Sequence, residues 1–145
     1  MLSENQYSMI GSFSNLSNIR AIREKQSKQY QRCDQLIRRK FSVSNMSDSK
    51  WIRLLRIASQ LYPDINTIDF KLVNSEDVRR TFVEEFEEHV DEQFFREPIL
   101  YKEIEWLEFP DSENSKLDEL RLKLKEKGHF PLLDTASGLR VIGYE

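Results

Sequence analysis

The densest group of residues that could do chemistry is the acidic stretch 84–92, which reads EEFEEHVDE. Glu85 and His89 are four residues apart and would share one face of a helix, where a carboxylate and an imidazole could hold a divalent ion. A di-metal bundle site uses Glu-x-x-His, but the residue three before His89 is Phe86, and two ligands are too few. We therefore interpret the stretch as a solvated acidic face and predict no metal site.

A second candidate is the pair Glu103 and Glu105, which on a regular strand would share a sheet face at about 7 Å. Paired carboxylates can act as general acid and base, but nothing else in the sequence supplies a group that would raise one pKa. The stretch 135–139, TASGL, lacks the Gly-x-Ser-x-Gly pattern of a nucleophile turn and is interpreted as a plain turn. Walker, dinucleotide and paired-cysteine motifs are absent from the sequence, so we predict no catalytic residue and no cofactor.

The composition is that of one compact domain, or of one domain with an arm. The chain has 145 residues, of which 39% are hydrophobic and 32% charged, and it lacks an apolar run of the roughly 20 residues that span a bilayer. We therefore predict no membrane span. Cys33 is the single cysteine, and a lone thiol with no secretory segment before it predicts a cytoplasmic protein. Its distance in sequence from both histidines favours a structural role for Cys33 over a nucleophilic one.

The charge is divided unevenly along the chain. Residues 1–45 contain eight basic and three acidic residues, a net charge of +5, whereas 46–145 contain 14 basic and 22 acidic residues, a net charge of −8. We predict a basic, partly helical N-terminal arm over 1–45 and an acidic domain over 46–145. Two alternatives for the arm are an organelle transit peptide, which Glu4 and Glu24 oppose, and a true start of a bacterial chain at Met46.

Hydrophobic periodicity predicts the elements that would position these residues. In the arm, steps of three and four residues predict a long helix from Ser17 to Phe41. In the domain, the pattern predicts a helix from 47–49 to Pro63, a strand over 68–72, a helix from 74–75 to Pro98, a strand over 99–109, a helix over 117–127 that ends before Gly128, and a hairpin formed by 130–133 and 139–144.

Several core positions follow from these elements. The first domain helix would bury Trp51, Leu54, Leu55, Ala58, Leu61 and Tyr62, and the second would bury Val78, Phe82, Val83, Phe86 and Val90. Trp106 is assigned to the core with Trp51. The predicted class is α+β, a small, mainly antiparallel sheet with helices packed on one face, in the order α-β-α-β-α-β-β after the basic helical arm.

Several short motifs of the acidic domain resemble those of a known family. These are Lys50-Trp51, the hexapeptide YKEIEW at 101–106, Phe130-Pro131-Leu132, Gly138-Leu139-Arg140 and Gly143-Tyr144. Over residues 50–145 the chain resembles an uncharacterised bacterial family of small acidic α+β proteins, known chiefly as a domain of unknown function. Such proteins are often encoded beside toxins, so the resemblance implies an immunity or inhibitor role.

These observations lead to three hypotheses of function. The first is a non-enzymatic module that binds a basic protein, such as a toxin, through Glu84, Glu85, Glu88, Asp91 and Glu92. The second is a nucleic-acid or membrane-surface binder that uses Arg38, Arg39 and Lys40 of the arm. The third is a metal-dependent enzyme. The sequence does not predict an oligomeric state.

Overall fold

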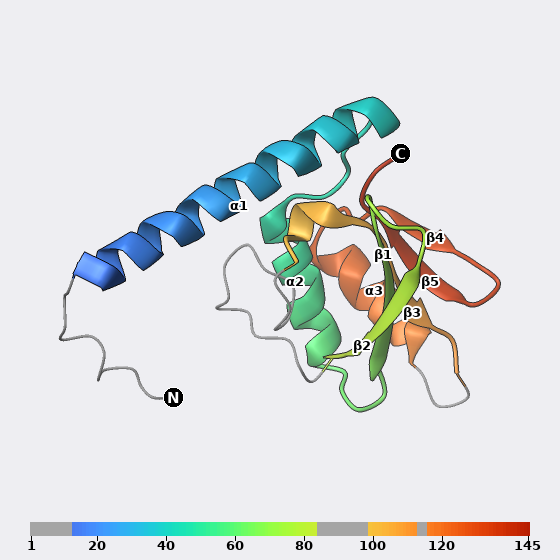
Figure 1. Ribbon diagram of the computed structural model, residues 1–145. Helices are drawn as coiled ribbons and strands as arrows, with labels where there is room; N and C mark the ends of the chain where they lie inside the picture. Colours follow the sequence, from blue (N-terminus) through green and yellow to red (C-terminus); the bar gives the residue numbers. More distant parts are fainter. Residues whose placement is uncertain (1–12, 84–98, 113–115) are drawn as a thin grey trace. The chain divides into compact units, whose positions relative to one another are not determined.

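The computed structural model describes residues 13–83, 99–112 and 116–145 (Figure 1). Contacts between residues divide the chain into two units, Met1–Gln35 and Leu36–Glu145. The first helix, α1 (Phe13–Lys40), runs through this division and has Arg38, Arg39 and Lys40 in its last turn. Cations there interact favourably with the helix dipole.

Helix α2 (Asp48–Ser59) begins at a serine cap. The Ser47 hydroxyl accepts a hydrogen bond from the Lys50 amide at 3.2 Å, which satisfies one of the free donors of the first turn. The helix buries Trp51, Leu54, Leu55 and Ala58, as predicted, and also Ile57. Tyr62 was predicted on the same face and is 45% exposed. The prediction for Tyr62 is wrong because the α-helix ends at Ser59, so its period does not extend to that residue.

Five strands form one sheet in the described part of the chain. They are β1 (Thr67–Leu72), β2 (Val78–Phe82), β3 (Ile104–Pro110), β4 (Leu132–Asp134) and β5 (Gly138–Ile142). Their spatial order is β2-β1-β3-β5-β4, and every pairing is antiparallel. Together with α1, α2 and α3 (Leu117–Lys127), this confirms an α+β fold with an antiparallel sheet.

The helix predicted from residue 74 is wrong over Val78–Phe82, where the chain forms β2. The Ser75 hydroxyl accepts a hydrogen bond from the Asp77 amide at 3.1 Å, so this serine closes a turn between β1 and β2 instead of capping a helix. Burial alternates over residues 80–83, where Thr81 and Val83 are buried and Arg80 and Phe82 are exposed. Val78 and Arg79 at the start of the strand are both exposed. Phe86 and Val90 of that predicted helix lie outside the described residues. After α2, the described order is therefore two strands, β3, α3 and two further strands.

One hydrophobic core joins the two helices of the second unit to the sheet. Alternate β1 residues, Ile68, Phe70 and Leu72, point into it, as the sequence predicted. The same core contains the buried residues of α2 and, from α3 and β5, Leu117, Leu120, Leu124, Leu139 and Val141. Helices α2 and α3 therefore pack on the same face of the sheet, an arrangement that can be followed in Figure 1. Full burial of a leucine-sized side chain contributes about 1.5–3 kcal/mol.

A bulge in β3 changes the direction of its side chains. Lys71 pairs with Trp106 and Leu72 with Ile104, so the register shifts at Glu105, the residue between them. Ile104 is in the core, but Trp106 faces the opposite side of the sheet, aligned with Lys71. The prediction that Trp106 belongs to the core is wrong for this reason, whereas that for Trp51 is confirmed.

The start of the predicted strand over 99–109 is also different. Residues Tyr101–Glu103 form the short 3-10 helix η3, and the strand begins only at Ile104. The Glu103 carboxylate accepts a hydrogen bond from the Leu100 amide at 2.7 Å, which fixes this turn. Ile99, Leu100 and Tyr101 are buried, so their apolar character serves the core from a turn rather than from a strand.

Residues 41–45 pair with the C-terminal end of the second unit. The amides of Ser42 and Val43 donate to the Glu145 carbonyl at 2.7 and 3.0 Å, and the Asn45 amide donates to the Gly143 carbonyl at 2.8 Å. The Phe41 ring stacks on Tyr144 with centroids 5.5 Å apart. This segment, which the sequence analysis placed in the arm, therefore contributes to the packed unit.

Candidate functional site

The candidate site lies on the sheet face opposite α2 and α3, which we call the outer face. Asp69 and Lys71 point to it because they alternate with the core residues of β1. The strand registers align Asp69 with Glu108 and Arg140, and Lys71 with Trp106 and Ile142. Among the described helices, α2 and α3 both pack on the other face.

The centre of the outer face is an arginine stacked on a tryptophan. The Arg140 guanidinium carbon lies 3.7 Å from the centroid of the Trp106 ring, within the range of a cation–π contact. Its Nε donates to Oε1 of Glu108 at 2.9 Å, so the guanidinium plane is fixed from two sides. The arrangement presents a rigid, planar surface of mixed apolar and cationic character.

Glu108 is the buried support of this stack, with only 4% of its surface exposed. The Thr135 hydroxyl donates to Oε1 at 2.9 Å and the Ser137 hydroxyl to Oε2 at 2.7 Å, both from the turn between β4 and β5. Burial raises the pKa of the Glu108 carboxyl, but the hydrogen bonds from Ser137, Thr135 and Arg140 outweigh burial, so the net pKa is lowered. The charged form is therefore the stable one at neutral pH.

The lowered pKa of Glu108 predicts a loss of stability in acid. A carboxyl group whose pKa is lower in the folded than in the unfolded chain contributes stability above its unfolded pKa. That contribution is lost as the pH falls below the usual value of 4.5 and through the folded pKa. We expect Glu108→Gln to reduce the free energy of unfolding at pH 7 by about 2 kcal/mol, the typical contribution of charge-assisted hydrogen bonds.

Urea denaturation of the wild type and of Glu108→Gln at pH 7 and below pH 4 measures this difference. The two proteins are expected to converge in stability as the pH falls. A difference that stays constant over this range would contradict the assigned role of Glu108.

Ion pairs balance the remaining charges of the outer face. Lys71 Nζ lies 2.6 Å from Glu105 Oε1, and Arg80 binds both oxygens of Asp69, at 2.7 and 3.1 Å. Exposed apolar side chains surround these pairs: Val78 and Phe82 on β2, and Leu133 on β4. The outer face therefore combines neutralised charges with exposed hydrophobic residues, unlike the acidic composition of 46–145 as a whole.

The residues predicted from sequence are placed differently by the structure. Glu84, Glu85, Glu88, Asp91 and Glu92, the predicted partner-binding residues, lie outside the described residues, as does His89. The described residues contain no cluster of three potential metal ligands. Glu103 and Glu105 do not act as a pair, because one holds η3 and the other binds Lys71.

The three residues of the basic cluster predicted to bind nucleic acid differ in their surroundings. Arg38 and Arg39 are exposed, but Lys40 Nζ donates to the Val73 carbonyl at 2.9 Å and lies 5.9 Å from the centroid of the Phe41 ring. One of the three cations is therefore bound to the backbone of the residue that follows β1. Nucleic-acid binding by the arm stays a prediction.

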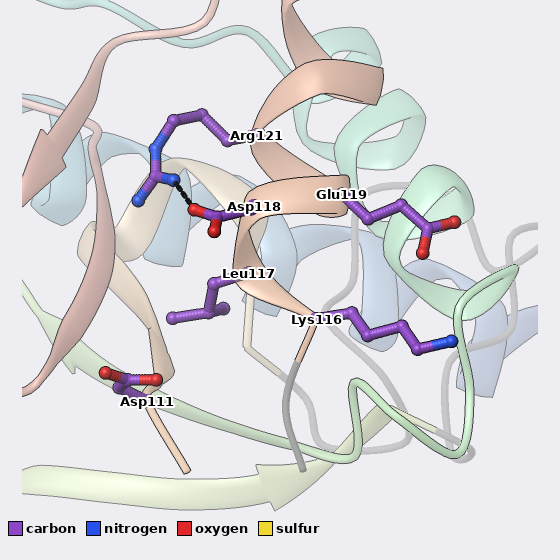
Figure 2. Close-up of a pocket in the computed structure, with 6 residues that line it drawn as sticks. All are labelled: Asp111, Lys116, Leu117, Asp118, Glu119 and Arg121. Atoms are coloured by element: carbon purple, nitrogen blue, oxygen red, sulfur yellow. Dashed lines mark hydrogen bonds and ion pairs between the residues drawn. The ribbon is translucent and has the colours of Figure 1, made fainter. Parts of the chain in front are cut away.

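A hollow of about 450 Å³ lies at the start of α3 (Figure 2). Figure 2 shows Arg121 and Asp118 extending to one side of the helix and Lys116 and Glu119 to the other. Both terminal nitrogens of Arg121 are occupied, by Asp118 and Asp134, each at 2.6 Å. Because these charged side chains extend to opposite sides of the helix and do not converge, the outer face is the stronger candidate.

Comparison of the chain with protein-family models, with characterised proteins and with solved structures finds no match. The resemblance of residues 50–145 to a bacterial family therefore stays a prediction. None of the described helices combines the length and the apolar character that a bilayer span requires.

Sequence reasoning missed the stack of Arg140 on Trp106. A signal for it existed in β3, where Leu107 and Phe109 are two residues apart and enclose Glu108. That alternation places Trp106 on the same face as Glu108, opposite the core. The prediction instead followed the alternation of Ile104 with Trp106, which the bulge interrupts.

Proposed function

We propose that the chain is a non-enzymatic protein-binding module whose contact surface is the outer face of the sheet. The observation that supports this proposal is the Arg140 guanidinium fixed between the Trp106 ring and the buried Glu108 carboxylate. Tryptophan and arginine are the residues most enriched at the energetic centres of protein interfaces. A preordered arginine also loses less side-chain entropy when a partner binds.

The neutralised charges of the outer face fit the centre of an interface. Charged groups that are already paired within one partner need no new counter-charge, and the apolar residues around them gain from exclusion of water. In this proposal, the acidic residues Glu84, Glu85, Glu88, Asp91 and Glu92 form a second element that attracts a basic partner from a distance. The partner class is a basic protein, and an immunity or inhibitor role follows from the proposed resemblance.

The first test replaces Trp106 by alanine. The change removes the ring but leaves the hydrogen bond of Arg140 to Glu108, so the fold is expected to persist by circular dichroism. Affinity for a partner is expected to fall about thirtyfold or more, the effect of losing a 2 kcal/mol interface residue, mostly through faster dissociation. Candidate partners are first identified among the proteins that the wild type retains from source-cell extract. Affinity is then measured with a purified basic partner.

Leu122→Ser is the matched control, because Leu122 is an exposed hydrophobic residue on α3, on the other side of the sheet. It is expected to bind like the wild type. Charge reversal at Glu84, Glu85 and Glu88 is expected to slow association at low salt and to leave dissociation unchanged. If Trp106→Ala and the wild type bind the partner with equal affinity, the outer face is not the contact surface.

A further inference from the structure

The outer edge of β2 carries backbone groups whose direction follows from a single hydrogen bond. The Val83 amide donates to the Asn66 carbonyl at 2.8 Å, so the backbone of residue 83 points toward β1. In an antiparallel strand alternate residues point to opposite neighbours. The amides and carbonyls of Val78, Arg80 and Phe82 therefore point away from β1, and in the described part of the chain β2 is the last strand on that side.

The side chains of the same three residues lie on the outer face and are symmetric about the middle one. Val78 is 56% exposed and Phe82 43% exposed, two positions before and two positions after Arg80. Two copies of β2 placed antiparallel with Arg80 at the centre would therefore set each Val78 opposite Phe82 of the other copy. Pairs of a β-branched and an aromatic residue are among the favourable cross-strand combinations.

The central position is compatible with this pairing. Arg80 would face Arg80 of the second copy, and two free arginines in that position would repel each other. However, Arg80 is bound through Nε and Nη2 to both oxygens of Asp69, at 2.7 and 3.1 Å. Each guanidinium therefore carries its own counter-charge into the contact, and the outward backbone groups of all three residues find partners.

We propose that the chain forms a two-fold symmetric dimer in which β2 pairs antiparallel with β2 of a second copy, centred on Arg80. The two sheets then form one continuous sheet, and the outward backbone groups of Val78, Arg80 and Phe82 are hydrogen-bonded across the symmetry axis. The dimer is a separate claim from the proposed binding surface, because a monomeric chain would still present Trp106 and Arg140.

The test is sedimentation equilibrium of the full chain from about 1 μM to about 1 mM, the range in which a contact of this small size is expected to associate. The wild type is expected to dimerise. Phe82→Lys places a charge opposite Val78 twice per dimer and is expected to raise the dissociation constant at least about tenfold. Val78→Lys is expected to act in the same direction, whereas Leu122→Lys, at a more exposed hydrophobic residue on α3, leaves the constant unchanged.

Amide exchange gives a readout that depends on the register. Exchange at Arg80 and Phe82 is expected to slow as the concentration rises, whereas exchange at Thr81, whose amide points toward β1, stays constant. A chain that is monomeric at about 1 mM would overturn the proposal. A dimer that both lysine variants on β2 leave intact, or that Leu122→Lys disrupts equally, would also overturn it.

Discussion

Replacement of Gly138 by alanine is expected to lower the free energy of unfolding by about 3 kcal/mol, at the upper end of the cost of overpacking. A Cβ atom on Gly138 would clash with the Phe109 carbonyl oxygen and lie 3.0 Å from the Pro110 Cα. Both atoms belong to the backbone of β3, so a side-chain movement cannot relieve the clash. Strands β3 and β5 would have to separate where Pro110 pairs with Gly138.

Gly128→Ala is the matched control for this prediction. Gly128 follows α3 and has a φ of 166°, an extended conformation that any residue adopts. Its nearest atoms to an added Cβ are side-chain atoms at 3.5 Å, an ordinary contact. Alanine there is expected to be neutral or to stabilise by up to about 1 kcal/mol through the unfolded chain. Urea denaturation of both variants measures the difference, and equal stabilities would contradict the close contact at Gly138.

Removal of residues 36–45 is expected to cost roughly 5 kcal/mol, because about four backbone hydrogen bonds and one aromatic stack are lost, each contributing about 1 kcal/mol. The lost bonds join Ser42, Val43 and Asn45 to Gly143 and Glu145, and the stack joins Phe41 to Tyr144. The measurement compares a chain that starts at Leu36 with one that starts at Met46.

The difference between these two truncated chains reports the segment 36–45 alone, whatever residues 1–35 contribute. The chain that starts at Met46 is expected to unfold at a lower urea concentration. The change in fluorescence near Tyr144 on unfolding is also expected to be smaller in this chain. Phe41→Ala in the full chain is a milder test and is expected to cost about 1 kcal/mol. If both truncated chains are equally stable, the packed unit begins at Met46, as the charge division suggested.

The sequence was sufficient for the elements in which one periodicity extends over several residues. The face of α2 that carries Trp51, Leu54 and Ala58 and the alternation of Ile68 and Phe70 in β1 were both predicted correctly. The same is true of α3, which ends just before Gly128, and of the final hairpin. In each of these segments the buried residues all fit a single pattern, and a cap or turn residue marks an end.

The failures at β2 and at the bulge in β3 share a physical origin in backbone pairing, which a local period does not show. Val78 and Phe82 are four residues apart, a spacing that fits a helix. The segment forms a strand because it pairs with β1. In the same way, the bulge at Glu105 exists because Gly143 lets its backbone approach the Ile104 and Glu105 carbonyls, where a Cβ would lie at 2.5 and 2.9 Å. The contacts of Gly143 join positions about forty residues apart and leave no local period.

The pairing of 42–45 with 143–145 has a consequence for how the chain is made. During synthesis the N-terminal side of this contact leaves the ribosome first, while its other half is still being translated. The second unit therefore lacks this closing pair of hydrogen-bonded segments until residue 145 has cleared the exit tunnel. Until that moment, Phe41 has no ring to stack on, and a nascent-chain chaperone would find it uncovered.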